Sequence, residues 1–166
     1  KHIINGSNIL SMLNSKLISN YKIKKNLILF ESDKEKLKKN SYDYKGKIDL
    51  NPFDLNLDIN LNKLKLNQLL NSNSLLLELY KTKLLLNKNI SAKINININK
   101  VQNSKLFNSG KIILSIDNGK FNFNRSTLYS NKMGSLIVDK SELSFKDDNL
   151  ILSSRFIFNV DDSKKF

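Results

Sequence analysis

Residues 49–66 have the sequence DLNPFDLNLDINLNKLKL, in which every second residue from Phe53 to Leu61 is apolar. Only Asp and Asn stand between these apolar residues. This alternation is typical of an extended strand with one apolar and one polar face. Pro52 and the Asn62–Lys63 pair each shift the phase of the pattern, as a β-bulge would. We therefore predict one long, bent strand over residues 42–66, or two strands that are nearly continuous.

Strict alternation returns over residues 90–98, and Asn118-Gly119 then provides the strongest short-range hairpin signal in the chain. A turn at these two residues would set a register in which apolar residues face apolar residues and opposite charges face each other. The predicted partners are Asp117 with Lys120, Ile116 with Phe121, and Leu114 with Phe123.

The rest of the second half gives the same kind of signal. A turn at Asp147-Asp148 would place Phe145 opposite Leu150 and Leu143 opposite Leu152, and a turn near Asp139-Lys140 would place Leu136 opposite Leu143. The last strand would continue in phase through Phe156, Phe158 and Val160. We predict an antiparallel meander with one consistently apolar face.

Two segments have helical rather than alternating spacing. Residues 7–18 have apolar residues at helical intervals behind a candidate N-cap at Ser7, which predicts a short helix. Residues 68–86 are Leu-rich, with Ser72 or Ser74 as the N-cap, and predict a helix packed on the sheet. Between them, residues 26–32 predict a strand, and the segment SDKEKLKKN that begins at Ser32 predicts a charged loop.

The charge of the chain, +13 at pH 7, raises the question of a polyanionic partner. Of the 28 basic residues, only Arg125 and Arg155 are Arg, and base readout depends mostly on Arg. The lysines are scattered along polar faces and loops, with the densest group at Lys34–Lys39. This pattern favours a solvated Lys-rich surface, with attraction to anionic lipid headgroups next and nucleic acid last. A nucleic-acid binder would need its lysines gathered in one patch.

No arrangement of residues indicates catalysis, a cofactor or a metal. The one His is His2, and no Ser or Thr has a plausible base as partner. The acidic pairs at 147–148 and 161–162 suit turns and strand ends better than a cation site. The absence of Cys excludes disulfides and thiolate metal sites. No apolar run is long enough for a membrane span and no signal peptide is present, so any anchor is expected outside this segment.

The long apolar face needs a cover, because each large aliphatic side chain removed from water contributes about 1.5–3 kcal/mol. One helix of residues 68–86 would be roughly 30 Å long and would cover only part of such a sheet. Two classes of cover remain. The sheet can close on itself or on neighbouring repeats to make a dry core, or its groove can hold lipid.

Residues 42–166 also resemble a known family. The order of GKIDLNPFDLNLDINL, a Leu-rich segment, an Ile-alternating strand, KMGSLIVDKSELSFKDDNLILSS and FIFNVDDSKKF resembles the C-terminal region of AsmA-like proteins. These bacterial envelope proteins are anchored in the inner membrane and belong to the wider repeating β-groove family. The resemblance implies a long, curled sheet whose hydrophobic groove guides phospholipid acyl chains between the two membranes of a Gram-negative cell.

The expected fold is mainly β (α+β), a long, antiparallel, strongly curled and taco-like sheet with the packed Leu-rich helix. Residues 1–41 are expected to continue a larger protein, and residues 42–166 to form the β-groove section. The residues expected to line the groove are the in-phase apolar positions of the strands: Leu55, Leu57, Ile59, Leu61, Ile94, Ile96, Ile98, Leu114, Ile116, Phe121 and Phe123.

The function expected from the resemblance is non-enzymatic binding and guidance of phospholipid acyl chains in the periplasm, for outer-membrane homeostasis. Its partners would be lipid, neighbouring β-groove repeats of the same chain, and the inner membrane through an anchor outside this segment. Nucleic acid, metals and cofactors are not expected. The alternative is a structural scaffold with a dry core that assists outer-membrane biogenesis.

Overall fold

The computed structural model describes residues 2–12, 15–33, 42–65, 87–146 and 149–161, and all its regular elements are strands. The strands are β1 (Ile3–Met12), β2 (Ser15–Lys24), β3 (Leu27–Ser32), β4 (Tyr42–Leu50), β5 (Phe53–Leu61), β6 (Leu64–Lys65), β7 (Ile90–Ile98), β8 (Val101–Gln102), β9 (Ser109–Asp117), β10 (Lys120–Asn122), β11 (Thr127–Ser130), β12 (Gly134–Lys146) and β13 (Asn149–Val160). The prediction of a mainly β fold is confirmed.

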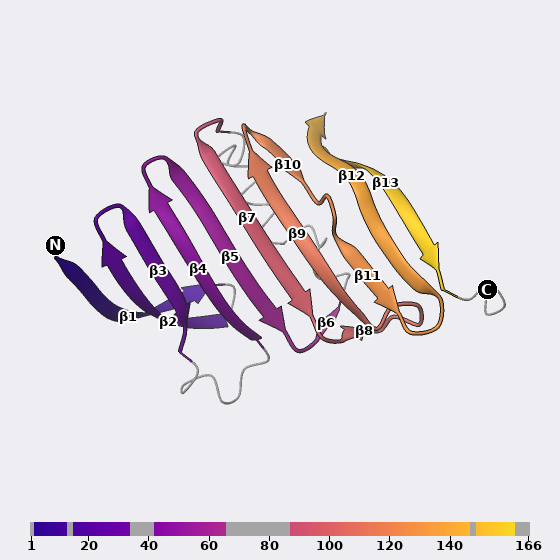
Figure 1. Cartoon of the computed structure of the whole chain (residues 1–166), viewed down its shortest axis with the longest axis horizontal. Coiled ribbons are helices and arrows are strands. Elements are labelled where there is room, and N and C mark those ends of the chain that lie inside the picture. The colour runs from indigo at the N-terminus through magenta and orange to yellow at the C-terminus, as the bar shows by residue number, and fades with distance from the viewer. Residues whose placement is uncertain (1, 13–14, 34–41, 66–86, 147–148, 162–166) are drawn as a thin grey trace.

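One sheet of 11 strands contains all of these elements except β6 and β8, which form a small sheet of their own (Figure 1). The order runs from β1 at one edge through β2, β3, β4, β5, β7 and β9. β10 and β11 together then occupy one position between β9 and β12, and β13 pairs with β12 at the other edge. The strands that precede residue 42 therefore belong to the same sheet as those that follow it.

The predicted meander in the second half is confirmed. Asp117 pairs with Lys120 and Ile116 with Phe121, and the ladder of β12 and β13 pairs Phe145 with Leu150 and Leu143 with Leu152. The predicted pair of Leu114 and Phe123 is absent from the ladder because β10 ends at Asn122. The strand predicted over residues 26–32 is confirmed as β3.

The prediction of one long strand over residues 42–66 is wrong. The chain reverses after Leu50, and β4 pairs antiparallel with β5, so that Ile48 lies opposite Leu55. Pro52 lies in the two-residue turn, where a fixed φ and a missing N–H are favourable, rather than at a bulge. The phase shift at Pro52 therefore marks a hairpin, and it keeps the apolar residues of both strands on one face.

The predicted turn near Asp139-Lys140 is also wrong. β12 continues through these residues, and its register with β13 shifts between Val138 and Lys140. This bulge inserts Asp139 as an extra residue, so Leu136 and Leu143 lie along one strand rather than opposite each other. The bulge changes the phase of β12 while the phase of β13 continues unbroken, which keeps the apolar residues of both strands on one face.

The predicted helix over residues 7–18 is wrong, because the segment divides between β1 and β2, which pair antiparallel along their whole length. Cross-strand pairing overrides the local spacing in this segment. The predicted helix over residues 68–86 lies outside the described residues and stays a prediction. The charged loop predicted for residues 32–40 begins at Ser32, which ends β3, and its residues 34–40 also lie outside the described residues. The described residues contain no helix.

Two pairs of neighbouring strands depart from the predicted antiparallel arrangement. β5 and β7 are parallel, from Phe53 opposite Ile90 to Leu61 opposite Ile98, and the small sheet pairs Leu64 of β6 in parallel with Val101 of β8. All these partners are 37 residues apart, as are the hydrogen-bonded Asn95 and Asp58. The succession of β5, a bend and the short strand β6 thus recurs 37 residues later as β7, a bend and the short strand β8. Parallel neighbours need a crossover connection, which a hairpin cannot provide.

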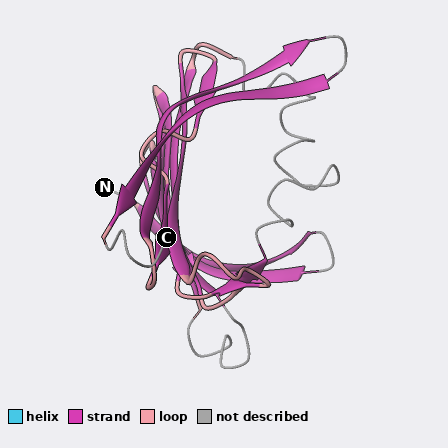
Figure 2. Ribbon diagram, turned by 90° about the vertical axis from the view of Figure 1, so that its right-hand side faces the viewer, coloured by secondary structure: helices cyan, strands magenta, loops and turns pink. Residues whose placement is uncertain are grey.

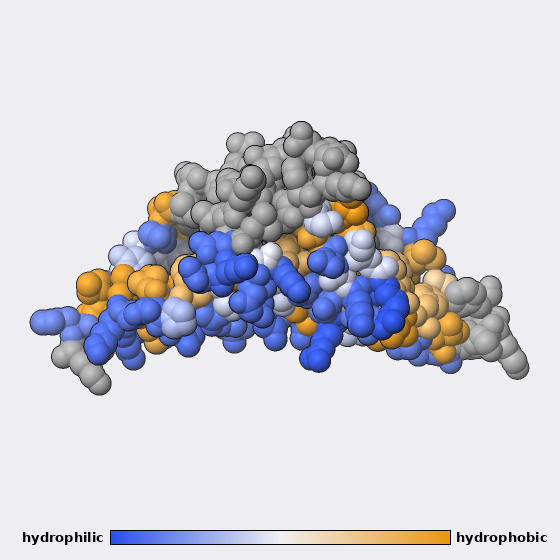
Figure 3. All heavy atoms as spheres, turned by 90° about the horizontal axis from the view of Figure 1, so that it is seen from above, coloured by the Kyte–Doolittle hydropathy of each residue, from blue (hydrophilic) through white to orange (hydrophobic). Residues whose placement is uncertain are grey.

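The strands curve strongly, so the sheet has a concave and a convex side (Figure 2). The curl predicted from the sequence is present. Hydrophilic residues gather along the convex side, and hydrophobic residues come to the surface towards the two ends of the sheet (Figure 3). The regular alternation of half-buried and exposed residues along β4 shows the same division between the two faces. We call them the apolar face and the polar face.

Candidate functional site

An unbroken row of apolar residues crosses the sheet from edge to edge on the apolar face. Each residue is the register partner of the next. The row consists of Ile4, Ile23, Ile28, Ile48, Leu55, Ala92, Ile116, Phe121, Leu143 and Leu152. At about 4.8 Å between strands, it is roughly 40 Å long. We call it the long row.

Burial varies systematically along the long row. Its centre is dry, with Ile116 3% and Phe121 2% exposed. Its ends are open, with Ile4 57% and Leu152 42% exposed. The flanking positions between centre and ends, such as Ile28, are half-buried. The apolar face is therefore sealed in the middle and accessible towards both edges.

The structure brings together all the residues predicted to line a groove. The register places those of β5, β7, β9 and β10 on the apolar face, and Phe123 packs against the same core cluster with its ring edge-on to Phe121, 5.2 Å between centroids. They differ in accessibility. The half-buried ones are Leu55, Leu57, Ile59, Leu61, Ile94 and Phe123, and the buried ones are Ile96, Ile98, Leu114, Ile116 and Phe121.

The buried residues form two clusters. One is centred on Leu114, 1% exposed, and Phe121; the other contains Ile96, Ile98 and Val101. Burying side chains of this size contributes about 1.5–3 kcal/mol each, so these clusters hold the middle of the sheet together. The buried predicted residues have a structural role in this arrangement, and the half-buried ones remain candidates for contact with a ligand.

The apolar face extends over β2, β3 and β4, which the sequence-based prediction of site residues missed. Here a second row runs through Gly6, Tyr21, Phe30, Gly46 and Leu57. The rings of Tyr21 and Phe30 lie over the glycines beside them, where a Cβ atom would overlap with the rings. The alternation of residues 21–24 carried part of this signal, but the helical interpretation of residues 7–18 concealed the pairing of β1 with β2.

Hydroxyl groups interrupt the apolar face beside these rings. The Tyr44 hydroxyl lies 2.6 Å from Ser19 Oγ and donates to the Ile18 carbonyl at 3.1 Å. The Ser32 hydroxyl, 3% exposed, accepts the Tyr44 backbone N–H at 3.2 Å. Burial, with a smaller contribution from neighbouring Tyr44, raises the pKa of Tyr42 above its ordinary value of 10.0. The hydroxyls of Ser19, Ser32 and Tyr44 are thus hydrogen-bonded within the protein.

The polar face is built from Asn and Asp ladders across the parallel strands. Asn95 donates to Asp58 at 2.8 Å, and Asn97 donates to Asn60 at 2.9 Å. Asn60 in turn donates to Asp43 at 2.7 Å. These bonds satisfy side chains that the alternation places on the solvent side, so the Asn-rich composition has a structural use here.

A hollow of about 740 Å³ lies mainly on the polar face, over β1 to β5. Its lining includes Lys22, Lys45 and Lys47 together with Glu31 and Asp58. It is wide open, and its lysines are partly balanced by the two carboxylates. Its lining also includes Gly6, Tyr21, Phe30 and Gly46 of the second row.

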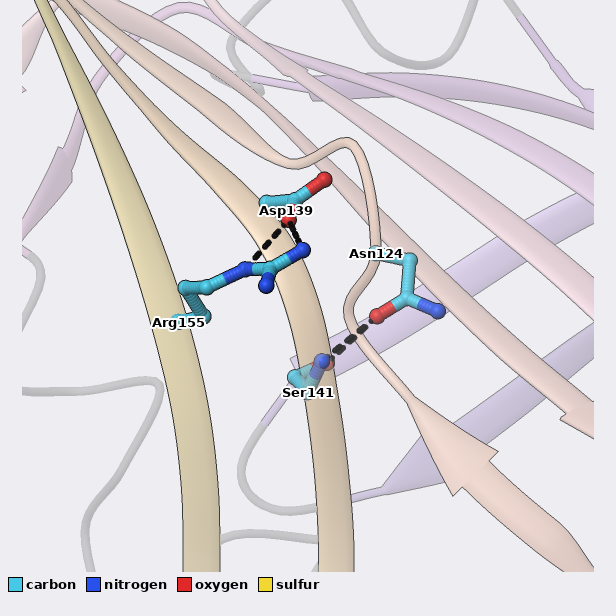
Figure 4. A network of polar contacts seen from close by, with 4 residues as sticks. All are labelled: Asn124, Asp139, Ser141 and Arg155. Atoms are coloured by element: carbon cyan, nitrogen blue, oxygen red, sulfur yellow. Dashed lines mark hydrogen bonds and ion pairs between the residues drawn. The ribbon is translucent and has the colours of Figure 1, made fainter.

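A polar network supports the sheet where β10 gives way to β11 (Figure 4). Asn124 Oδ1 accepts the Ser141 backbone N–H at 2.6 Å and its hydroxyl at 3.2 Å, and Ser141 Oγ accepts the Phe123 N–H at 2.6 Å. Beside it, Arg155 Nε donates to Asp139 at 2.6 Å, and the pair is an ion pair near the bulge. The contacts of Asn124 and Ser141 satisfy backbone N–H groups where the ladder is interrupted.

No group of three or more His, Cys, Asp or Glu side chains within the described ranges could hold a metal ion. The same part of the chain has no helix with the length and hydropathy of a membrane span. Comparison with protein-family models, with curated proteins and with solved structures found no match. The resemblance of residues 42–166 to AsmA-like proteins therefore rests on strand order and apolar periodicity alone.

Proposed function

We propose that this chain is a section of a lipid-binding groove that holds and guides phospholipid acyl chains along the apolar face. The observation that carries the proposal is the long row. It crosses the sheet from β1 to β13 without a polar residue and ends in exposed residues at both edges. A sheet built only to close a core would not need apolar continuity out to its two edges.

The dimensions of the long row suit acyl chains. The hydrocarbon core of a bilayer is about 30 Å thick, so one acyl chain spans about half of it. The accessible part of the row from Ile4 to Leu55 is roughly 20 Å long at about 4.8 Å between strands, which offers room for one acyl chain along the sheet. The half-buried residues on either side of the buried centre, such as Ile48 on one side and Leu143 on the other, supply the accessible apolar surface.

The charge of the chain fits a lipid partner as well. With a net charge of +13 at pH 7 and lysines on the polar face, the section attracts anionic headgroups, while its apolar face binds the acyl chains of the same lipids. By its resemblance to AsmA-like proteins, we place the section in the periplasm of a bacterial envelope. There it would join further β-groove sections and an inner-membrane anchor, and serve outer-membrane homeostasis.

Photo-crosslinking tests the proposal directly. Benzoylphenylalanine in place of Phe30 puts an aromatic photoreactive probe on the half-buried apolar face, and the same probe in place of Lys47 puts it on the polar face. We expect phospholipid adducts at position 30 and none at position 47, detected by mass spectrometry of protein purified from cells. Equal adducts at both positions, or none at position 30, would contradict the proposal.

A dry structural scaffold for outer-membrane biogenesis is the second candidate, and the burial of Leu114 and Phe121 favours it. In that case the apolar face serves only folding, and protein purified from cells carries no phospholipid. The centre of the sheet fits this description. The exposure of Ile4 and Leu152 at its ends does not, which is why we prefer the groove.

A further inference from the structure

The first edge strand, β1, exposes large apolar residues on both faces. On the apolar face Ile4 is 57% exposed, and on the polar face Ile3 and Ile9 are 49% and 64% exposed. The interior strands β4, β5 and β7 have no large apolar residue on their polar face. β1 therefore has exposed apolar side chains on both faces, beside the edge that no described strand covers.

The opposite edge strand, β13, has the same property. Its exposed residues fall on both faces: Leu152, Phe156 and Val160 on the apolar face, and Ile151 and Ile157 on the polar face. Their exposed fractions lie between 40% and 55%. The two ends of the sheet are therefore alike in chemistry, as Figure 3 also shows.

Neither edge carries the usual protection against strand addition. Proteins blunt exposed edges with Lys, Pro or very short strands. β1 is 10 residues long with neither a charge nor a Pro, and β13 is 12 residues long with Arg155 as its one charged residue, which is paired with Asp139. Both edges thus offer a long, uncharged backbone to a further strand.

We propose that the sheet associates head to tail with a second copy of this chain, with β13 of one copy pairing beside β1 of the next. The sheet contains one parallel pair, and its remaining neighbours are antiparallel, which leaves β1 and β13 running in the same direction. Simple translation along the sheet axis therefore brings the two edges together as a parallel pair. One kind of contact then covers both edges, whereas pairing β1 with β1 would leave every β13 exposed.

The long row supplies the match across this junction. It ends at Leu152 on β13 and begins again at Ile4 on β1, so head-to-tail pairing continues one apolar row from copy to copy. The charge of +13 on each copy opposes association, but neither edge strand brings an unpaired charge to the contact. Because salt screens long-range repulsion over about 8 Å at physiological ionic strength, we expect association to strengthen as salt is raised.

The test uses one Lys on each edge, placed on the polar face so that the apolar face is untouched. Ile9→Lys blocks β1, and Ile157→Lys blocks β13. In sedimentation velocity the unmodified chain is expected to form species beyond the dimer as its concentration rises. Each variant alone is expected to be monomeric, with association weakened about tenfold or more. An equimolar mixture of the two is expected to form a heterodimer and nothing larger, since one free β1 meets one free β13.

Ser91→Lys is the matched control, because it adds the same charge to the polar face of the interior strand β7, opposite Asp54. It is expected to associate like the unmodified chain. Circular dichroism of every variant checks that it is folded. If an edge variant does not fold, Ile3→Lys or Ile151→Lys takes its place. A chain that stays monomeric at all concentrations and salts, or an Ile157→Lys variant that dimerises alone, would overturn the proposal. Lipid adducts at position 30 are unaffected in either case, so the two proposals fail separately.

Discussion

The ring of Phe30 on β3 lies directly over Gly46, its register partner on β4, and fills the space that a side chain there would need. A Cβ atom at Gly46 would lie 2.7 Å from Cε1 of Phe30. Gly46→Ala is therefore expected to destabilise the fold by about 1–3 kcal/mol, the usual cost of overpacking. Urea denaturation of the variant measures this loss.

A second substitution shows whether the ring is the cause. Phe30→Leu combined with Gly46→Ala should recover part of the loss, because the smaller side chain makes room for the methyl group. Additive losses in the double variant would contradict the assignment.

Leu57 and Leu114 lie in one row of the apolar face, on either side of Ile94, but differ in burial: Leu57 is half-buried and Leu114 is 1% exposed. We expect Leu57→Asp to fold and to reduce lipid crosslinking at position 30, because a carboxylate among acyl chains is costly. Leu114→Asp should unfold the sheet, since a buried, unpaired charge has no access to water.

Thermal melts and crosslinking yields of the two variants separate the candidate functions. Unfolding of both would favour the dry scaffold. A folded Leu57→Asp with undiminished lipid adducts would rule out the groove along β5. Ile59→Asp, at another half-buried position of the same strand, serves as the replicate.

Ser126 is 6% exposed, and its hydroxyl substitutes for a missing ladder partner of β9: it accepts the Ile113 N–H at 2.9 Å and donates to the Ile113 carbonyl at 3.2 Å. Ser126→Ala is expected to cost about 1–3 kcal/mol, because it leaves buried backbone groups unpaired. Thr127→Ala is the neighbouring control. Its hydroxyl bond to Arg125 is exposed, so chemical denaturation should show a much smaller change. Equal losses would contradict this role for Ser126.

The raised pKa of Tyr42, caused first by burial and then by Tyr44, predicts an alkaline limit to stability. The folded state favours the neutral phenol, so the stabilisation is complete below the ordinary value of 10.0 and is lost as pH rises through the folded pKa. Tyr42→Phe should flatten the fall of the melting temperature above that pH. Tyr129→Phe, at an exposed position, should leave the curve unchanged. An identical curve for Tyr42→Phe would show that other groups set the limit.

On the polar face, the exposed Asn56→Ser should change the free energy of unfolding by less than about 0.5 kcal/mol, as is usual for surface positions. Asp58→Lys should cost more, because it removes the bond from Asn95 and faces Lys45 across the strand pair. Urea denaturation of both variants measures the difference. Equal stability would show that the Asn and Asp ladder contributes nothing.

The sequence by itself determined the residues of each face. Alternation depends only on the pleat of a strand, so it placed Leu55 to Leu61 and Ile94 to Ile98 correctly on one side. The Asn118-Gly119 turn likewise set the register of its hairpin, because a two-residue loop leaves a single way to pair the flanking strands.

Tertiary structure alone decided how the phase shifts are resolved. A shift at Pro52 and a shift at Asp139 look alike in sequence, but the first is a turn and the second a bulge, because only the available partner strand distinguishes them. Pairing between β1 and β2 likewise overrode the helical spacing of residues 7–18. Burial was decided at the same level. Leu57 and Leu114 share a row and a chemistry but differ in exposure, because burial depends on which other parts of the chain lie over a residue, and local sequence does not encode this.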